Sequence, residues 1–236
     1  MFQATFDNCD LFKKLITCID KLIKEAVFEF TETGIHLQAM DSSRVTMTAF
    51  SIPSSTCSSY KCKSPISVGI NIPSLVKVLS CVNSNDKLNL SYSKDSLELK
   101  FTSSKFTLKT MNIDQEKFDI PEDLEYSLTE CISSNEFAKI CKDLLQFDES
   151  LYISKSDGKL TFAAVGDIGS ATFDIPSILE SDDISLEFSN QYLVQFSRAS
   201  VLSDVVEIKM DARYPMMLKY TLDDVDLVFF LASKFI

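Results

Sequence analysis

Few side chains in this sequence have the types and spacing that catalysis requires. His36 is the only histidine among the 236 residues, and no G-x-S-x-G motif supplies a nucleophile for it to activate. The acidic pairs Asp182-Asp183 and Asp223-Asp224 resemble metal-binding carboxylates, but both fall in turns expected between strands, where solvated acids are normal. A phosphate-binding loop is also missing, because the five glycines form no G-x-x-x-x-G-K-[ST] motif. We therefore predict no enzymatic activity and no cofactor.

The cysteines and the apolar segments narrow the class of protein. The seven cysteines have no regular spacing, which favours buried, reduced thiols in a cytosolic or nuclear protein. Cys57 and Cys62 have no neighbouring ligands with which to bind zinc. No apolar run reaches about 18 residues, so we expect no membrane span. The N-terminal Met1-Phe2-Gln3-Ala4 lacks the basic region that precedes the apolar stretch of a secretory signal.

The charge balance is strongly acidic. The chain has 23 Lys and Arg against 34 Asp and Glu, a net charge of −11. Spread evenly, this charge opposes nucleic-acid binding, because phosphate contacts depend on Lys and Arg. The positions of the bases therefore matter more than their number.

The elements that position these bases begin with a helix and a hairpin. A helix is predicted over residues 9–24, capped by Asp7 or Asn8, because its apolar residues recur at the helical period. A hairpin is predicted over residues 28–40, with Gly34 at its turn. Met40 then lies on the outward face of the second strand, where a thioether is available to contact an apolar partner.

More strands and a second helix complete the first half. A strand is predicted over residues 45–52, and Asn71-Ile72-Pro73 has the composition of a helix start. The apolar alternation over residues 88–92, 97–101 and 106–110 predicts a meander of three strands.

The segment over residues 111–126 has neither the helical nor the strand periodicity of apolar residues. It is acidic, contains proline and is predicted to be an extended connector between two domains. Phe118 and Ile120 are apolar within it, which an unstructured linker does not need. We therefore expect another group to bind them.

The second half repeats the order of the first. Ser133 and Glu136 form a capping box before a helix, and Ser156-Asp157-Gly158 separates the strands of a second hairpin. A short helix over residues 191–200 precedes three more strands. This duplication predicts an α+β fold of two similar domains, 1–110 and 127–236, joined by the connector.

The outward faces of the four predicted helices gather basic residues. No aromatic side chains lie between these bases, so base stacking is not expected and diffuse attraction to duplex phosphates is favoured. The predicted DNA-binding residues are Lys13, Lys14, Lys21, Lys24, Lys77, Lys139, Lys142 and Arg198.

Several motifs, in the same order, resemble the eukaryotic sliding-clamp family of the proliferating cell nuclear antigen. They are Met1-Phe2-x-Ala4, Leu22-Ile23-x-Glu25-Ala26, Gly34-x-x-Leu37-Gln38-x-Met40-Asp41-Ser42-Ser43, the run over 136–144, and Leu231-Ala232-x-Lys234. The resemblance implies two sliding-clamp domains with antiparallel sheets outside and four helices on the inner face of a ring. Three subunits of that family close head to tail around duplex DNA, which here implies pairing of strand 106–112 with strand 171–175 of the next subunit.

The resemblance also implies the function and the partners. It implies a nuclear, non-enzymatic DNA sliding clamp, a homotrimer that acts as a polymerase processivity factor and as a docking platform for replication and repair proteins. The implied partners are double-stranded DNA, a replicative DNA polymerase, a clamp loader and proteins with clamp-interacting peptides. The implied peptide pocket consists of Met40, Arg44, Met47, Phe118, Ile120, Tyr126, Pro215, Phe230 and Ala232.

The chain departs from the family pattern at several positions. Arg44 replaces a usual histidine, Ser233 replaces a proline, and the acidic tail after Lys234 is absent. Lys155 or Lys159 is the candidate for the family's modifier-attachment site. Two other interpretations stay open, a subunit of a heterotrimeric checkpoint-type clamp and a small acidic β-rich interaction protein without DNA contact.

Overall fold

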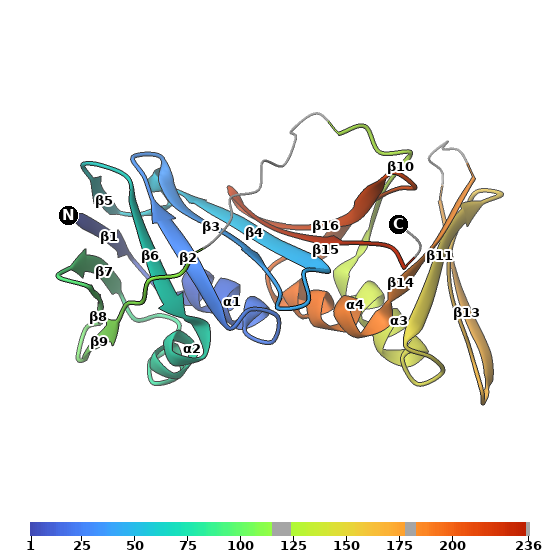
Figure 1. Ribbon diagram of the computed structural model, residues 1–236, viewed down its shortest axis with the longest axis horizontal. Helices are drawn as coiled ribbons and strands as arrows, with labels where there is room; N and C mark the ends of the chain where they lie inside the picture. Colours follow the sequence, from blue (N-terminus) through green and yellow to red (C-terminus); the bar gives the residue numbers. More distant parts are fainter. Residues whose placement is uncertain (115–123, 178–182, 235–236) are drawn as a thin grey trace. The chain divides into compact units, whose positions relative to one another are not determined.

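The computed structural model describes residues 1–114, 124–177 and 183–234 (Figure 1). These residues form two compact units. The first comprises Met1–Asp119 with Leu222–Leu227, and the second comprises Ile120–Thr221 with Val228–Ile236. The predicted connector residues Phe118 and Ile120 lie outside the described residues.

The first unit contains two helices and two antiparallel sheets. One sheet has the strand order β5-β1-β7-β8-β9, and β4-β3-β2-β6 are neighbours in the other. The elements are β1 (Phe2–Phe6), α1 (Asp10–Ile19), β2 (Glu25–Phe30), β3 (Gly34–Met40), β4 (Thr46–Pro53), η1 (Ser54–Thr56), β5 (Ser59–Cys62), β6 (Ile66–Asn71), α2 (Ile72–Ser80), β7 (Leu88–Ser93), β8 (Ser96–Lys100) and β9 (Lys105–Lys109).

Helix α1 begins where the sequence predicts and ends earlier. The Asn8 side chain accepts a hydrogen bond from the backbone N–H of Asp10 at 3.2 Å, so it satisfies one of the free N–H groups at the helix start. The helix ends at Ile19, whose carbonyl accepts from the N–H groups of both Leu22 and Ile23 at 3.0 and 2.9 Å. These two apolar residues are therefore buried from a turn after the helix, and the prediction of a helix to residue 24 is wrong.

The start of helix α2 and the turn of the first hairpin lie where the sequence predicts them. The Asn71 side chain caps α2 by accepting from the Ser74 N–H at 3.0 Å, with Pro73 in the first turn. In β3, Ile35 and Leu37 are buried at 0 and 2 % exposure. Gly34 is required at the turn, because a Cβ there would lie 2.1 Å from the Ile52 carbonyl oxygen.

Strand β4 buries a face that begins with two threonines, Thr46 and Thr48, and not the face of Met47. Thr48, Phe50 and Ile52 are buried, whereas Met47 and Ala49 are half-buried. Threonine is β-branched and packs well on a pleated surface, so the buried face carries residues that look polar in the sequence.

The second unit repeats this plan. Its neighbouring strands are β13-β12-β11-β14 in one sheet and β10-β15-β16-β17 in the other, apart from the end of β16 and the start of β17 (Leu222–Leu227), which group with the first unit. The elements are β10 (Leu128–Ser133), α3 (Ser134–Leu144), β11 (Ser150–Ser156), β12 (Lys159–Gly166), β13 (Gly169–Pro176), β14 (Ile184–Ser189), α4 (Asn190–Phe196), η2 (Ser197–Val201), β15 (Val205–Asp211), β16 (Tyr214–Leu222) and β17 (Val225–Leu231).

The helix cap and the hairpin turn predicted for the second unit are also present. Ser133 caps α3 by accepting from the Glu136 N–H at 3.4 Å, and Asp157 and Gly158 form the hairpin turn at φ 49° and 71°. The short helix predicted over 191–200 divides into α4 and the 3₁₀ turn η2. Each unit thus has a strand, a helix, several strands, a second helix and three strands, which confirms the duplicated α+β fold.

Candidate functional site

The helices lie in two pairs, and in the first unit the pair carries three of the predicted bases. Helix α1 contacts α2 (Figure 1). Lys13 is half-buried and its ammonium donates to the Val82 carbonyl at 2.8 Å, while Lys14 pairs with Asp10 at 2.8 Å along α1. Lys77 is exposed in the last turn of α2. Lys13 is therefore fixed by the fold, whereas Lys14 and Lys77 reach solvent.

Two further bases of the first unit lie outside the helices. Lys21 and Lys24 are exposed in the segment between α1 and β2. The structure therefore corrects their assignment to a helical face, although both remain exposed. The Lys24 carbonyl accepts from the Ile72 N–H at 2.9 Å, which fixes this segment next to the start of α2.

In the second unit, α3 contacts α4 (Figure 1) and carries the other lysines. Lys139 pairs with Asp143 at 2.6 Å and its Nζ lies 5.5 Å from the centre of the Phe173 ring. Lys142 is exposed in the last turn of α3. Arg198 is half-buried and belongs to η2 rather than to α4.

Ion pairs between exposed side chains do not prevent these lysines from contacting phosphate. The Lys139 and Asp143 side chains are 69 and 43 % exposed, and pairs of this kind contribute only about 0–1 kcal/mol. A polyanion therefore competes readily for these ammonium groups.

Each unit has an outermost strand at the position where ring closure was predicted. Strand β9 pairs with β8 at one end of its sheet, and β13 pairs with β12 at one end of its own. Phe106 and Leu108 of β9 are half-buried, as are Phe173 and Ile175 of β13. Both edges therefore present backbone hydrogen-bonding groups beside a partly apolar face.

The predicted pocket residues of the first unit lie at the β3–β4 hairpin. Met40 and Met47 are direct cross-strand partners and both are half-buried. The buried Asp41 carboxylate accepts from the Val45 and Thr46 N–H groups at 2.9 Å each. Arg44 is exposed at the tip of this loop, at φ 58°.

The predicted pocket residues of the second unit include one hydrogen-bonded pair. The Tyr126 hydroxyl donates to the Pro215 carbonyl at 3.2 Å. Tyr126 is half-buried, and burial together with the charge of Asp211 raises the pKa of its phenol. Phe230 is only 9 % exposed, so it is chiefly a core residue, whereas Ala232 is half-buried.

A side-chain cluster next to Tyr126 was missed in the sequence. Asp211, Arg213 and Tyr214 lie at the β15–β16 turn, and Asp211 hydrogen-bonds Ser127 across 84 positions of sequence. Only the polar pair Asp211 and Arg213 at a turn was visible in the sequence, and such pairs are common on surfaces.

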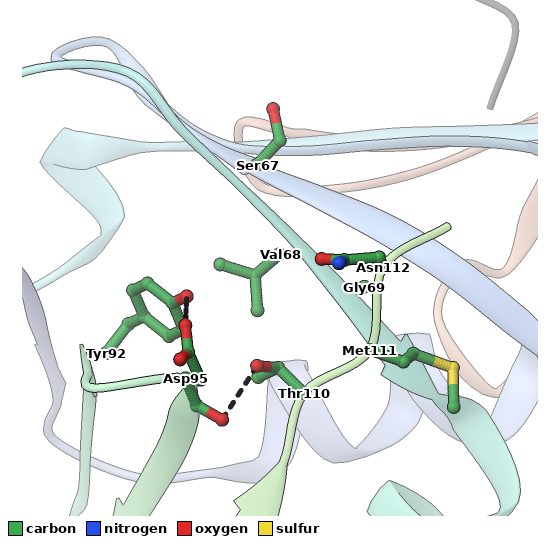
Figure 2. A pocket seen from close by; sticks show the side chains of 8 residues that line it. All are labelled: Ser67, Val68, Gly69, Tyr92, Asp95, Thr110, Met111 and Asn112. Atoms are coloured by element: carbon green, nitrogen blue, oxygen red, sulfur yellow. Dashed lines mark hydrogen bonds between the residues drawn. The ribbon is translucent and has the colours of Figure 1, made fainter. Parts of the chain in front are cut away.

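The first unit also contains an open, polar pocket of about 310 Å³ (Figure 2). The Tyr92 hydroxyl points to the Asp95 carboxylate at 3.5 Å, and the Thr110 hydroxyl donates to the Asp95 carbonyl at 2.8 Å. The lining residues are Ser67, Val68, Gly69, Tyr92, Asp95, Thr110, Met111 and Asn112. They include no histidine, cysteine, lysine or arginine, and the only carboxylate among them is that of Asp95, next to the Tyr92 hydroxyl.

The candidate catalytic and metal-binding residues are not brought together. His36 lies on β3, with Nδ1 2.8 Å from the Ser51 hydroxyl and Nε2 3.1 Å from the Thr31 hydroxyl. Asp183, Asp223 and Asp224 are exposed, and Asp182 lies outside the described residues. The part of the chain that the structure describes holds no group of three or more potential metal ligands.

All seven cysteines are free thiols, but the expectation that they are buried holds only in part. Cys9, Cys18, Cys62 and Cys141 are buried, and Cys57 is half-buried. The other two thiols, Cys81 and Cys131, are exposed. Among the described helices, none is long and apolar enough to cross a membrane.

The two lysines proposed for modifier attachment have opposite environments. Lys155 is buried, with 4 % of its side chain exposed, and pairs with Glu130 at 2.9 Å. Lys159 has 58 % of its side chain exposed. Of the two amines, only that of Lys159 is accessible to an attaching enzyme.

The duplicated unit, with two helices and two antiparallel sheets in each copy, is the fold of a DNA sliding clamp. The models of the proliferating cell nuclear antigen N-terminal and C-terminal domains match residues 1–126 and 119–235. The chain therefore belongs to the proliferating cell nuclear antigen family.

Individual relatives support this over the full length. The proliferating cell nuclear antigen of Saccharomyces cerevisiae is 34 % identical, with 100 % of this chain and 98 % of the relative covered. That of Chaetomium thermophilum is also 34 % identical, over 99 and 98 %. Proliferating cell nuclear antigen 2 of Drosophila melanogaster is 31 % identical, over 99 and 98 %.

Proposed function

We propose that this clamp closes with two further copies of itself into a homotrimeric ring around duplex DNA. In this state it is a nuclear, non-enzymatic processivity factor for a replicative DNA polymerase, built from domains 1–110 and 127–236 and connector 111–126. The observation that carries the proposal is that β9 and β13 are each an end strand of their sheet, one in each unit, in a chain of this family.

The side chains of these two strands support head-to-tail pairing. On β9, half-buried Phe106 and Leu108 are flanked by exposed Lys105 and Lys109, and on β13, half-buried Phe173 and Ile175 lie on either side of exposed Asp174. Pairing β9 of one subunit with β13 of the next therefore continues an apolar face and brings opposite charges together. Closed pairing of this heterologous kind also removes both edges.

The helices next to these strands support DNA binding. Helix α2 contacts β9, and α3 contacts β13, so edge pairing brings the helices that carry Lys77 and Lys142 to the same junction between subunits. A series of such exposed ammonium groups attracts phosphates without reading sequence. Ring closure adds topological retention, so an acidic chain needs few bases to stay on DNA.

The partner-binding surface is proposed at the methionine pair of β3–β4 and at Tyr126 with Pro215. Phe118, Ile120, Phe230, Ala232 and Arg44 complete the proposed set. Apolar and aromatic groups at the surface are typical of sites that bind peptides of other proteins. The proposed partners are the polymerase, a clamp loader and repair proteins with clamp-interacting peptides.

The solution mass of the purified chain tests the trimer. Light scattering coupled to size-exclusion chromatography is expected to give three times the 26.5 kDa chain mass. A stable monomer would instead favour the alternative, a subunit of a heterotrimeric checkpoint-type clamp. We prefer the homotrimer because both complementary edges are present in one chain.

Retention on circular DNA tests the proposed DNA contacts. Lys77→Glu combined with Lys142→Glu is expected to reduce retention on nicked circles and to lower the slope of log affinity against log salt by about one per lost contact. Lys61→Glu, an exposed change on β5 at the other edge of the β9 sheet, is the charge-matched control. Equal retention of both variants would contradict the assignment of the helical lysines.

A further inference from the structure

A single buried carboxylate joins the segment at Ser127 to the β15–β16 turn. The Asp211 side chain is 2 % exposed. It accepts from the Ser127 N–H and hydroxyl at 3.1 and 2.6 Å. It also accepts from Arg213 through Nε, Nη2 and the backbone N–H, at 2.9, 3.1 and 2.8 Å. The carboxylate is therefore fully hydrogen-bonded, as a buried charge requires.

Arg213 connects the Asp211 carboxylate to the aromatic rings of Tyr214 and Tyr126. Its guanidinium lies 5.0 Å from the centre of the Tyr214 ring, and Tyr214 meets Tyr126 edge-on, with ring centres 5.9 Å apart. The Nη2 of Arg213 also donates to the Glu125 carbonyl at 3.4 Å. The residues on both sides of Tyr126 are thus bound to the Asp211–Arg213 pair.

We propose that Asp211 and Arg213 are positioning residues of the partner surface, which hold Tyr126 against Pro215 so that the two receive an apolar side chain of a partner peptide. This inference rests on the proposed function, because Tyr126 and Pro215 belong to the proposed partner surface. An aromatic side chain that is already ordered before binding loses less conformational freedom when the peptide arrives. The pair acts through Tyr126 and does not itself need to touch the peptide.

Two substitutions of Arg213 remove different parts of its contact with Asp211, so they are expected to weaken peptide binding to different extents. A guanidinium presents two parallel donors to a carboxylate, which an ammonium group cannot do. Arg213→Lys therefore keeps the charge and loses the two-point contact, whereas Arg213→Ala loses both. Asp211 keeps its hydrogen bonds from Ser127 and from the Arg213 backbone N–H in both variants, so these changes are expected to lower the stability without unfolding the chain.

The experiment measures binding of a fluorescein-labelled peptide from the clamp-interacting segment of a replicative DNA polymerase. Asp211→Asn and Arg213→Ala are expected to bind about tenfold more weakly, as for the loss of a charge-assisted hydrogen bond, with Arg213→Lys in between. The matched control is Glu207→Gln, since Glu207 lies on the same strand and pairs with Lys209 at 2.9 Å. It is expected to bind as the unmodified protein does.

A spectroscopic readout separates positioning from a general loss of stability. Burial and then the charge of Asp211 raise the pKa of Tyr126. Absorbance titration at alkaline pH, with Tyr126→Phe to identify the signal, is expected to show a lower pKa of Tyr126 in Asp211→Asn and no change in Glu207→Gln. Because loss of the Asp211 charge alone lowers this pKa, positioning is read from Arg213→Lys, which keeps both charges. A lower pKa of Tyr126 in that variant reports release of the ring from its partly buried position, whereas an unchanged pKa with a lower Tm would indicate a merely structural role.

The outcomes distinguish this inference from the function on which it rests. If the unmodified protein binds no peptide, both proposals are overturned. If it binds, and Asp211→Asn and Arg213→Ala bind as tightly as Glu207→Gln, the positioning role is overturned and the partner surface stands. If Asp211→Asn fails to fold, Arg213→Ala and Arg213→Lys still decide the question.

Discussion

The two units differ in the side chains that join their first two strands, which belong to different sheets. In the first unit, Phe2 of β1 stacks on Phe30 of β2, with ring centres 3.8 Å apart. In the second, the corresponding strands β10 and β11 are joined by Glu130 and Lys155, at 2.9 Å. The Ser177 hydroxyl hydrogen-bonds both charged groups. The duplicated fold thus accepts either stacked aromatic rings or a satisfied ion pair at this place.

The ion pair of the second unit tolerates fewer substitutions than the stacked rings of the first unit. Apolar burial is non-directional and tolerates small changes of shape. A buried ion pair offsets its desolvation only when both partners and their extra hydrogen bonds are present. The second unit is therefore expected to be more sensitive to loss of one side chain than the first.

The largest expected effect comes from removing one charge. Glu130→Ala is expected to lower the free energy of unfolding by about 3–5 kcal/mol, because Lys155 is then buried without its partner. Denaturant unfolding followed by circular dichroism measures the change. The double variant Glu130→Leu with Lys155→Met is expected to be neutral or more stable, and a double variant as unstable as Glu130→Ala would break the comparison.

A smaller loss is expected at the aromatic junction of the first unit. Phe30→Leu removes the stacking with Phe2 and some volume, which predicts a loss of about 1–2 kcal/mol in the same unfolding experiment. Phe147→Leu, at a half-buried phenylalanine of the second unit, is the control, with a loss of under about 1 kcal/mol. Equal losses at the two sites would remove the special role of the stacked pair.

Acid is expected to affect the two units in different pH ranges. Burial lowers the pKa of His36 below its ordinary 6.5, so its contribution in the first unit is complete above that pH and declines as the pH falls through the lowered value. In the second unit, hydrogen bonds from Arg213 hold the pKa of Asp211 well below its usual range. The hydrogen bond from Ser150 likewise lowers the pKa of Glu187, which also pairs with Lys234. These contributions are lost only below the ordinary carboxyl values near 4.

Hydrogen exchange resolved along the chain measures these two ranges. Protection is expected to fall first around β3 and later, at lower pH, around β14 and β15. His36→Gln is expected to remove the first step and leave the second. A single transition shared by both units would contradict the assignment.

The smallest effect is expected on the surface of α3. Lys139→Ala removes an exposed i,i+4 ion pair with Asp143 and is expected to cost about 0.5 kcal/mol or less. The thermal midpoint measured at low and high salt tests this, since screening removes the difference between the variants. A loss comparable to that of Glu130→Ala would show that α3 depends on this exposed pair as β10 depends on Lys155.

Local elements were predictable because their causes are local. The cap at Asn71 and the turn at Asp157 and Gly158 follow from neighbouring side chains and backbone preferences. The end of α1 was not, because Leu22 and Ile23 continue the helical period yet are buried from a turn. Buried Thr48 was missed for a similar reason, since its hydroxyl made it look exposed.

The site was predictable only in part, because its contacts cross long stretches of sequence. The family motifs indicated Tyr126 and Pro215, but no pattern joined Ser127 to Asp211, which lie 84 positions apart. Likewise, nothing in the sequence distinguishes the buried Lys155 from the exposed Lys159 on the same hairpin. Charged residues are usually solvated, so a buried, paired lysine is recognised only in the folded structure.

The buried Lys155 amine has a practical consequence. Reagents that acylate amines reach Lys159 in the folded chain and reach Lys155 only when β10 and β11 separate, since 4 % of the Lys155 side chain is exposed. In mass spectrometry of acylated peptides from this hairpin, Lys159 therefore serves as the internal standard and Lys155 as the reporter. Their ratio records how often the second half of the molecule opens, without any added label.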